Sequence, residues 1–370
     1  MPVPTQKTSK PVLVQILRSP LGGIGKHVRD IAEYFSADSS VEVLIFTNLS
    51  DANFTPQLPS NVIIYNLDIA EDPKPADLKN LIFMFNILRN KSVKVLHGHG
   101  AKGGFYSRLL GLFLRSKCIY TPHGGSLHRS HGRLKNCIYD AIEKLLIPLT
   151  NIFLFESKYS KELFVKNVGS NSRMAVNPNG IDVKTEVMPK KFSPGTMLNL
   201  KSFGLLRHLK GHDILIEACA LLQKNQVPFH YTVFGKGEEK SNLEKLIQEK
   251  GLSDQVEIKP YTENIEAEML TADIVVQPSR YESFGYVPIE AMALKVPVTS
   301  SFVGGLKEIM TEDIGYISYN NSPESYFDIL KALYEGKTDP MLKAAKAYVT
   351  VQHDFSKTAM LRKIKTLYFS

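Results

Sequence analysis

Cysteine and long apolar runs are both scarce in this sequence. The three cysteines, Cys118, Cys137 and Cys219, are odd in number and have no paired spacing. This pattern argues against a disulfide framework or a zinc site and favours a reducing compartment. The first ten residues are polar, and the apolar run from Val12 to Leu17 is six residues long, which is shorter than a signal peptide or a spanning helix requires. We therefore expect a cytoplasmic protein, or one peripheral on the inner face of the cytoplasmic membrane.

Carboxylates are absent from one long stretch of the first half. Between Leu78 and Tyr139 the chain carries eleven Lys or Arg and five His, but no Asp or Glu. Residues 1–188 have a net charge of +8 (23 basic, 15 acidic), and residues 189–370 have none (22 and 22). A solvated face usually mixes both signs, so the alternative is a surface for an anionic partner such as lipid head groups or a pyrophosphate-linked acceptor. Because no nucleic-acid motif accompanies the stretch, we expect an anionic membrane surface and no nucleic acid.

The remaining composition is that of an ordinary globular protein. Hydrophobic residues make up 43% and charged residues 22% of the 370 residues, and this length suits two domains. Short β-branched runs, such as VEVLIFTN and NIFLFES, alternate with helical patterns, such as residues 105–114 and 134–146. This alternation predicts parallel sheets covered by helices on both faces.

The rhythm restarts after a linker rich in Pro, Lys and Gly at residues 183–195. We expect an α/β protein of two Rossmann-like domains, residues 1–183 and 195–354, which face each other across a cleft. A C-terminal helix of about residues 355–370 is expected to pack back on the first domain. In such sheets ligands bind at the carboxyl ends of the strands.

A glycine-rich loop, LGGIGKH, joins the first strand to the first helix and holds Gly22 and Gly23. Glycines there let backbone amides approach a phosphate or a sugar closely, at the positive end of a helix. A Walker loop would need Gly at Pro20 and Ser or Thr at His27, and the dinucleotide fingerprint would need a third glycine at Val28. A ligand-binding loop and a tight structural turn both remain open.

The most informative segment is PSRYESFGYVPIEAMA, which follows the strand-like DIVVQ. Pro288 suits the first turn of a helix, so Glu290 should lie near a helix N-terminus, while Glu282 belongs to the preceding loop. Two carboxylates folded towards one site can hold sugar hydroxyls and a ribose diol, because each accepts two hydrogen bonds in a plane. The alternative for Glu290 is that it only complements the helix dipole.

These motifs resemble those of glycosyltransferase family 4, a large retaining family with the GT-B fold. The segment EsFGyvpiEAMA, starting at Glu282, matches the family pattern E-x-F-G-x-x-x-x-E-A-M-A. VNPNGID, LKGHDILIEA, the GKGEEKSNL block, GGLKEI, VLHGHGAKGG and YTPHGG resemble other family segments in the right order. The resemblance therefore covers nearly the whole chain.

The resemblance also assigns roles, position by position. Lys210 falls on the pyrophosphate-binding lysine, whose charge would stabilise the departing diphosphate. Where the family has an arginine the chain has Leu205, so we expect Arg207, on the same face of a strand, to supply the second cation. Glu282 matches the glutamate at the donor sugar, and Glu290 the one that holds the ribose.

Three further residues complete this assignment. Phe284 and Gly285 lie in the same donor loop, and His123 matches the histidine that reaches the reaction centre from the first domain. A histidine after a strand can also simply cap loop carbonyls. Other histidines invite a metal reading, but they lack helical spacing and carboxylate or thiolate partners, so we expect no catalytic metal; they are His97, His99, His128 and His131.

The function implied is a retaining hexosyl transfer from a nucleotide-diphosphate sugar, a co-substrate, to a glycan or lipid-linked acceptor. It needs no cofactor, and cell-surface polysaccharide or lipopolysaccharide biosynthesis is the family-level expectation. No carboxylate stands out as a nucleophile, so the departing phosphate should itself take the acceptor proton. Alternatives are an epimerase-like enzyme of the same fold, a nicotinamide oxidoreductase, which the missing third glycine and Asn48 at the end of the second strand disfavour, and a non-catalytic relative, given Leu205.

Overall fold

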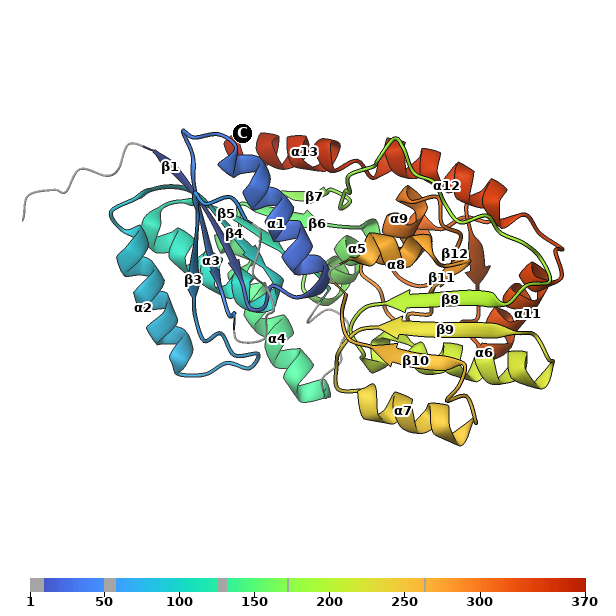
Figure 1. Cartoon of the computed structure of the whole chain (residues 1–370). Helices are drawn as coiled ribbons and strands as arrows, with labels where there is room; N and C mark the ends of the chain where they lie inside the picture. Colours follow the sequence, from blue (N-terminus) through green and yellow to red (C-terminus); the bar gives the residue numbers. More distant parts are fainter. Residues whose placement is uncertain (1–9, 50–57, 125–131, 172, 263) are drawn as a thin grey trace, which may run out of the picture. The chain divides into compact units, whose positions relative to one another are not determined.

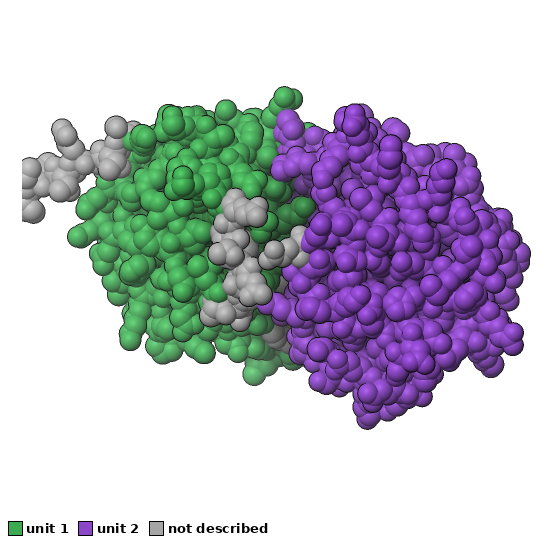
Figure 2. All heavy atoms as spheres, in the orientation of Figure 1, with its two compact units in different colours: residues 1–178, 359–370 green, residues 179–358 purple. Residues whose placement is uncertain are grey.

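The computed structural model describes residues 10–49, 58–124, 132–171, 173–262 and 264–370. Contacts within the chain divide it into two compact units. Unit 1 comprises residues 1–178 and 359–370, and unit 2 comprises residues 179–358 (Figure 2). In the described ranges no helix is both long and apolar enough to cross a membrane.

Unit 1 is built on a seven-stranded parallel sheet with the order β3-β2-β1-β4-β5-β6-β7 (Figure 1). Its central strand β1 is buried from Val12 to Leu17, because a parallel strand covered on both faces is apolar on both. The strands are β1 Pro11–Leu17, β2 Glu42–Thr47, β3 Val62–Asn66, β4 Ser92–His99, β5 Lys117–Thr121, β6 Ile152–Phe155 and β7 Met174–Val176.

Helices cover both faces of this sheet. Val28 and Phe35 of α1 share one core cluster with Ile364 of α13, whereas Met84 of α2 and Leu110 of α3 belong to the cluster on the other face. The helices are α1 Gly22–Ser36, α2 Ala76–Leu88, α3 Gly100–Leu114, α4 Arg133–Leu146, α5 Lys158–Asn167 and α13 Lys357–Phe369, with a 3₁₀ turn at Ile147–Leu149.

Unit 2 repeats this architecture with a six-stranded parallel sheet of order β10-β9-β8-β11-β12-β13. Its strands are β8 Leu198–Phe203, β9 Phe229–Phe234, β10 Val256–Lys259, β11 Ile274–Gln277, β12 Val298–Ser301 and β13 Tyr316–Ser318. Its helices are α6 His212–Lys224, α7 Lys240–Glu249, α8 Ile265–Leu270, α9 Tyr286–Ala293, α10 Leu306–Ile309, α11 Pro323–Tyr334 and α12 Pro340–Asp354, with a 3₁₀ turn at His208–Lys210.

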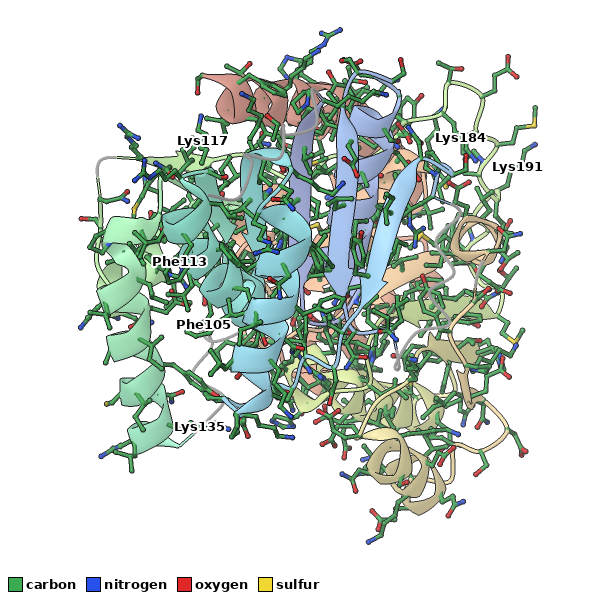
Figure 3. The ribbon with its side chains drawn as sticks, turned by 90° about the vertical axis from the view of Figure 1, so that its left-hand side faces the viewer. Phe105, Phe113, Lys117, Lys135, Lys184 and Lys191 are labelled. Carbon is green, nitrogen blue, oxygen red and sulfur yellow. The ribbon has the colours of Figure 1, made fainter. Side chains whose placement is uncertain are left out.

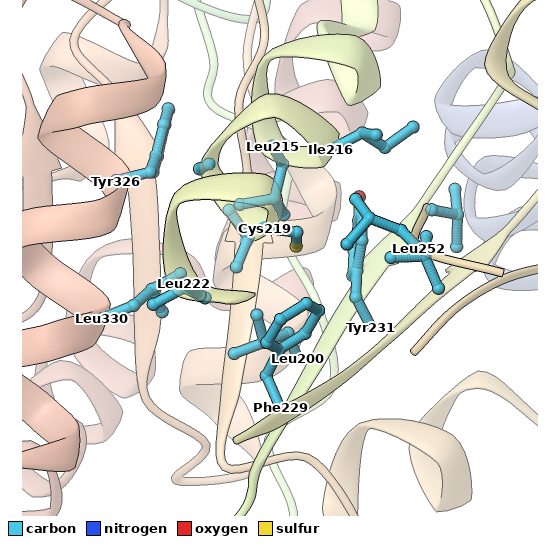
Figure 4. Packing of buried hydrophobic residues seen from close by; sticks show 14 of the residues in the cluster. Leu200, Leu215, Ile216, Cys219, Leu222, Phe229, Tyr231, Leu252, Tyr326 and Leu330 are labelled. Carbon is cyan, nitrogen blue, oxygen red and sulfur yellow. The ribbon is translucent and has the colours of Figure 1, made fainter. Parts of the chain in front are cut away.

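The core of unit 2 also has two layers. Cys219 and Leu222 of α6 and Leu330 of α11 pack with Leu200 and Tyr231 of the sheet (Figure 4), while α9 and α12 pack on the opposite face. Two parallel sheets, each covered by helices, confirm the α/β class predicted from the alternating pattern.

The strand order fixes where ligands can bind. The order changes direction between β1 and β4 in unit 1 and between β8 and β11 in unit 2, because the chain leaves β1 and β8 towards one side and returns on the other. The carboxyl ends of strands at such switch points are the usual ligand sites of open α/β sheets.

Candidate active site

Two predicted donor residues meet at the switch point of unit 2. Lys210 follows β8 and Glu282 follows β11, and the two strands are neighbours. Nζ of Lys210 donates to Oε2 of Glu282 over 2.7 Å, with 21% and 14% of the two side chains exposed. A cation and a carboxylate therefore stand together at a reachable sheet edge.

Backbone contacts hold these two loops in register. The amides of Arg280 and Tyr281 donate to the carbonyl of Leu209 at 2.8 and 3.3 Å. Gly211 has a φ of +70°, and a Cβ there would lie 2.0 Å from the carbonyl oxygen of Pro278. The glycine after Lys210 is thus required by the close approach of the two loops.

A bidentate ion pair ties the same loops from the side. Both terminal nitrogens of Arg280 donate to Asp213 at the start of α6, at 2.7 and 2.6 Å. Burial by itself raises the pKa of Asp213, but the hydrogen bonds from Arg280 outweigh it and the pKa is lowered. Both residues were missed in the sequence, where they carry no motif beyond the family segments around them.

The remaining residues of the donor loop differ in exposure. Phe284 is 5% exposed and packs edge-on against Tyr286 and Phe355, in the core of unit 2. Gly285 caps α9 with a φ of +124°, and a Cβ there would lie 2.6 Å from Leu306. Glu290, half-buried, is the fifth residue of α9 and lies beyond its first turn, which weakens the reading that it only complements the helix dipole.

The argument that placed Arg207 was wrong in one respect. Strand β8 ends at Phe203, and Gly204 follows with a φ of +143°, so Leu205 and Arg207 do not share the face of a strand. Arg207 is instead a loop residue whose side chain is 42% exposed and whose Nε lies 3.5 Å from Glu238. Its carbonyl accepts from the amide of Lys210 over 2.8 Å, so the two residues share one tight turn after β8.

The glycine loop of unit 1 has two different parts. Gly22 and Gly23 open α1 and are exposed, and Gly22 has a φ of +64°. A Cβ at Gly25 would lie 1.7 Å from the carbonyl oxygen of Pro20. The third glycine is therefore needed for the turn itself, while the first two leave the helix N-terminus open.

His123 follows β5, and a carboxylate lies directly behind it. Its Nδ1 is 2.6 Å from Oε2 of Glu156, at the end of β6, and both side chains are 5% exposed. His123 has a φ of +51°, a conformation uncommon outside glycine. In this conformation the His123 side chain contacts Glu156. Glu156 is a site residue that the sequence analysis did not identify.

Two more histidines surround His123. Nδ1 of His99, the last residue of β4, lies 3.1 Å from Nε2 of His123, and the ring of His27 from α1 lies 5.4 Å from that of His123. Burial lowers the pKa of His99 well below its ordinary value. His27, His99 and His123 could together hold a metal ion.

His97 has a structural role. It is fully buried and bonds Tyr368 of α13 at 2.7 Å and Thr121 at 2.9 Å, so it ties the C-terminal helix to the sheet. His128 and His131, the other histidines considered for metal binding, lie outside the described residues.

Basic residues of the stretch that lacks carboxylates form ion pairs with acidic residues from other parts of unit 1. Four of its basic residues pair with acidic residues before or after it in the chain. These pairs are Lys91–Glu42, Lys102–Asp77, Arg108–Glu143 and Lys135–Asp72, at 2.7, 2.6, 2.7 and 2.6 Å. The surface is consequently less basic than the sequence count suggests.

Two family models match the chain. The model "Glycosyltransferase Family 4" matches residues 21–185, and "Glycosyl transferases group 1" matches residues 183–350. With the two parallel sheets and the cation–carboxylate pair at a switch point, they define the class as a nucleotide-sugar glycosyltransferase with the GT-B fold. The chain belongs to glycosyltransferase family 4, a family of retaining enzymes.

Individual relatives are distant but cover much of the chain. A D-inositol 3-phosphate glycosyltransferase of Pseudarthrobacter chlorophenolicus is 25% identical over 92% of this chain and 89% of its own. The Escherichia coli O-antigen biosynthesis glycosyltransferase WbnH is 26% identical over 74% of this chain and 78% of its own. The structure of Anabaena HepE in complex with UDP-glucose is 19% identical, with a TM-score of 0.80 over 97% of this chain and all of the other, and shows a shared fold.

Proposed function

We propose that this protein transfers a hexose, with retention, from a uridine-diphosphate sugar to a lipid-linked or glycan acceptor at an anionic membrane surface. The pathway we propose is assembly of a cell-surface polysaccharide or lipopolysaccharide. The pairing of Lys210 with Glu282 is the observation that carries the donor assignment. The uridine nucleotide is suggested by the UDP-glucose held in the Anabaena neighbour, and the pathway by the O-antigen relative.

In this proposal the ion pair is exchanged when the donor binds. The diphosphate takes the place of Glu282 beside Lys210, and the released carboxylate accepts hydrogen bonds from the sugar hydroxyls. Glu290 holds the ribose, Phe284 and Gly285 shape the loop, and Arg207 supplies a second cation.

The sugar is then transferred directly to the acceptor, without a covalent enzyme intermediate. The bond from the anomeric carbon to the phosphate oxygen breaks, and the acceptor oxygen bonds that carbon on the same face. The acceptor proton passes to the departing phosphate, whose charge Lys210 stabilises. His123 of unit 1, with Gly22 and Gly23, would hold the acceptor side of this reaction.

Nucleotide binding tests the donor site. Lys210→Ala should weaken the binding of UDP by about 10- to 150-fold, which is the contribution of one hydrogen bond to a charged group. The affinity for uridine should be nearly unchanged. Lys346→Ala, which removes an exposed lysine of the same unit 3.6 Å from Asp313, is the matched control. Equal losses for UDP and uridine, or none for UDP, would contradict the assignment.

The membrane assignment comes from the orientation of α4. Its buried side chains include Asn136 and Glu143, whereas Leu134, Ile138 and Leu145 are 77%, 51% and 77% exposed. Spacings of four and seven residues place these three on one face. The helix is therefore apolar towards the outside, as in helices that lie in a membrane interface.

Two other helices of unit 1 also expose apolar side chains. Leu78 and Ile82 of α2 and Phe113 of α3 are 63%, 53% and 69% exposed. Figure 3 views unit 1 from the side on which α2 and α4 lie and labels Phe113 and Lys135 there. Exposed apolar side chains of this kind suit the interface of a bilayer.

Vesicle binding tests this surface. Leu134→Ser with Leu145→Ser should weaken binding to anionic vesicles by about tenfold or more for each side chain, since burying a leucine is worth about 1.5–3 kcal/mol. Leu342→Ser, at an exposed leucine of α12 (55%), is the control. If the intact protein ignores anionic vesicles but transfers to an inositol phosphate, the acceptor is a soluble phosphorylated polyol, as the name of the Pseudarthrobacter relative suggests.

A further inference from the structure

Three imidazoles from separate elements of unit 1 form a compact triangle. His27 lies on α1, His99 ends β4 and His123 follows β5. Their ring centroids are 5.6, 5.4 and 5.3 Å apart. One nitrogen of each ring lies within 4.8 Å of the others.

The outer nitrogens of two of these rings are fixed by acceptors. Nε2 of His99 is 2.8 Å from Oε1 of Gln15, whose own Nε2 donates to Tyr368 over 3.0 Å. Because the amide oxygen can only accept, His99 must donate from Nε2. Nδ1 of His123 lies 2.6 Å from the Glu156 carboxylate, whose charge favours the proton on that nitrogen.

This arrangement leaves two nitrogens facing each other. When both rings are neutral, Nδ1 of His99 and Nε2 of His123 each present a lone pair to the other over 3.1 Å. Two acceptors at this distance repel unless a cation or a further proton lies between them. An imidazole that donates its outer N–H to a carboxylate or amide oxygen is the usual support of a metal-binding histidine.

The triangle also has the size that a metal ion requires. At a metal–nitrogen distance of about 2.0–2.1 Å and tetrahedral angles, the centroids of three imidazole ligands lie roughly 5.2 Å apart. The observed spacings of 5.3–5.6 Å are close to this value. Nitrogen ligands without a carboxylate among them favour zinc-like transition ions over Mg²⁺ or Ca²⁺.

We propose that His27, His99 and His123 form a three-histidine site for one divalent transition ion, with Gln15 and Glu156 as the supports of its ligands. Three protein ligands would leave a fourth tetrahedral position for water or an anion. A bound ion would occupy Nε2 of His123, the nitrogen that faces His99. If His123 acts in the proposed transfer reaction, the ion-bound form is therefore inactive, and this inactivity rests on the proposed function.

Cobalt binding tests the site directly. Chelator-treated full-length protein should take up one Co²⁺ per chain with the visible d–d bands of a tetrahedral ion, and Zn²⁺ should displace it. His27→Gln, which keeps most of the side-chain volume, should lose these bands, whereas His230→Gln, at a partly exposed histidine of unit 2 that pairs with Glu257, should keep them. Glu156→Gln should keep one ion per chain and bind it about 10- to 100-fold more weakly.

Thermal melting in metal-free buffer checks that each variant is folded. Absence of tetrahedral bands in the intact protein, or an unchanged affinity in folded His27→Gln, would overturn the site and show that a shared proton occupies the gap. These spectra need no sugar substrate, so their failure would leave the transferase proposal standing. Full occupation by Zn²⁺ without loss of transfer would overturn the inactive form and place His123 outside the reaction centre.

Discussion

Replacing Arg108 should lower the stability of unit 1 strongly, because its guanidinium group is completely buried. Its side chain is 0% exposed and lies 4.3 Å above the ring of Tyr120. Nε donates to the carbonyl of Gly104 and one terminal nitrogen to Glu143, both over 2.7 Å. Glu143 also accepts from the Tyr120 hydroxyl at 2.9 Å.

The magnitude follows from what the substitution leaves behind. Arg108→Met keeps the apolar volume but leaves the Glu143 carboxylate buried with one neutral donor, a loss that typically costs about 3–5 kcal/mol. Removing both charges, with Arg108→Met and Glu143→Leu together, leaves Tyr120 without its acceptor at a cost of about 1–3 kcal/mol. The double variant should therefore be more stable than the single one.

Scanning calorimetry and urea unfolding can measure these differences in stability. Lys346→Met, at the exposed pair with Asp313, should change stability by less than about 1 kcal/mol. A loss below about 1 kcal/mol for Arg108→Met, or a double variant no more stable than the single, would refute the claim that leaving Glu143 buried without Arg108 is what destabilises unit 1.

Three further predictions concern unit 2. Gly285→Ala should cut donor turnover strongly with a smaller loss of stability, measured by UDP-sugar kinetics and melting, because its φ of +124° and the contact with Leu306 force the loop to move. Acid should destabilise the unit: burial lowers the pKa of His212 to about 4, so the unfolded chain binds the extra proton first. Stability should fall by up to about 3 kcal/mol between pH 6.5 and 4, and less steeply in His212→Asn. If Arg207 is the second cation, Arg207→Ala should weaken UDP binding as much as Lys210→Ala does. Unaltered UDP binding would show that Arg207 does not contact the diphosphate.

The fold was largely predictable because its elements follow local rules. Alternating apolar strands and amphipathic helices indicated two parallel α/β sheets, and these are present. Helix α2 was missed because it lacks that pattern: Leu78, Ile82 and Phe83 are at least 45% exposed, while Met84 and Leu88 are buried. Apolar residues on both sides of a helix give no 3.6-residue period to detect.

The site was predictable where motifs carried it and not where distant segments meet. The family pattern pointed to Lys210 and Glu282, which lie 72 positions apart and form an ion pair. The contact of Gln15 with Tyr368 spans 353 positions. No local spacing reports such a contact, and Glu156 behind His123 gave no signal for the same reason.

Charge counted along the chain and charge counted in space lead to different expectations for membrane binding. Eleven basic residues without a carboxylate between Leu78 and Tyr139 would make binding mainly electrostatic, and it would then vanish at high salt. Four of those residues are paired with acidic partners from outside the stretch, and the same contacts turn Glu143 inward and Leu145 outward on α4. We therefore expect about 0.5 M salt, roughly three times physiological ionic strength, to weaken vesicle binding without abolishing it. The apolar contribution to binding is not screened by salt. Complete release at that salt concentration, with Leu145→Ser having no effect at low salt, would show that charge alone holds the protein at the membrane.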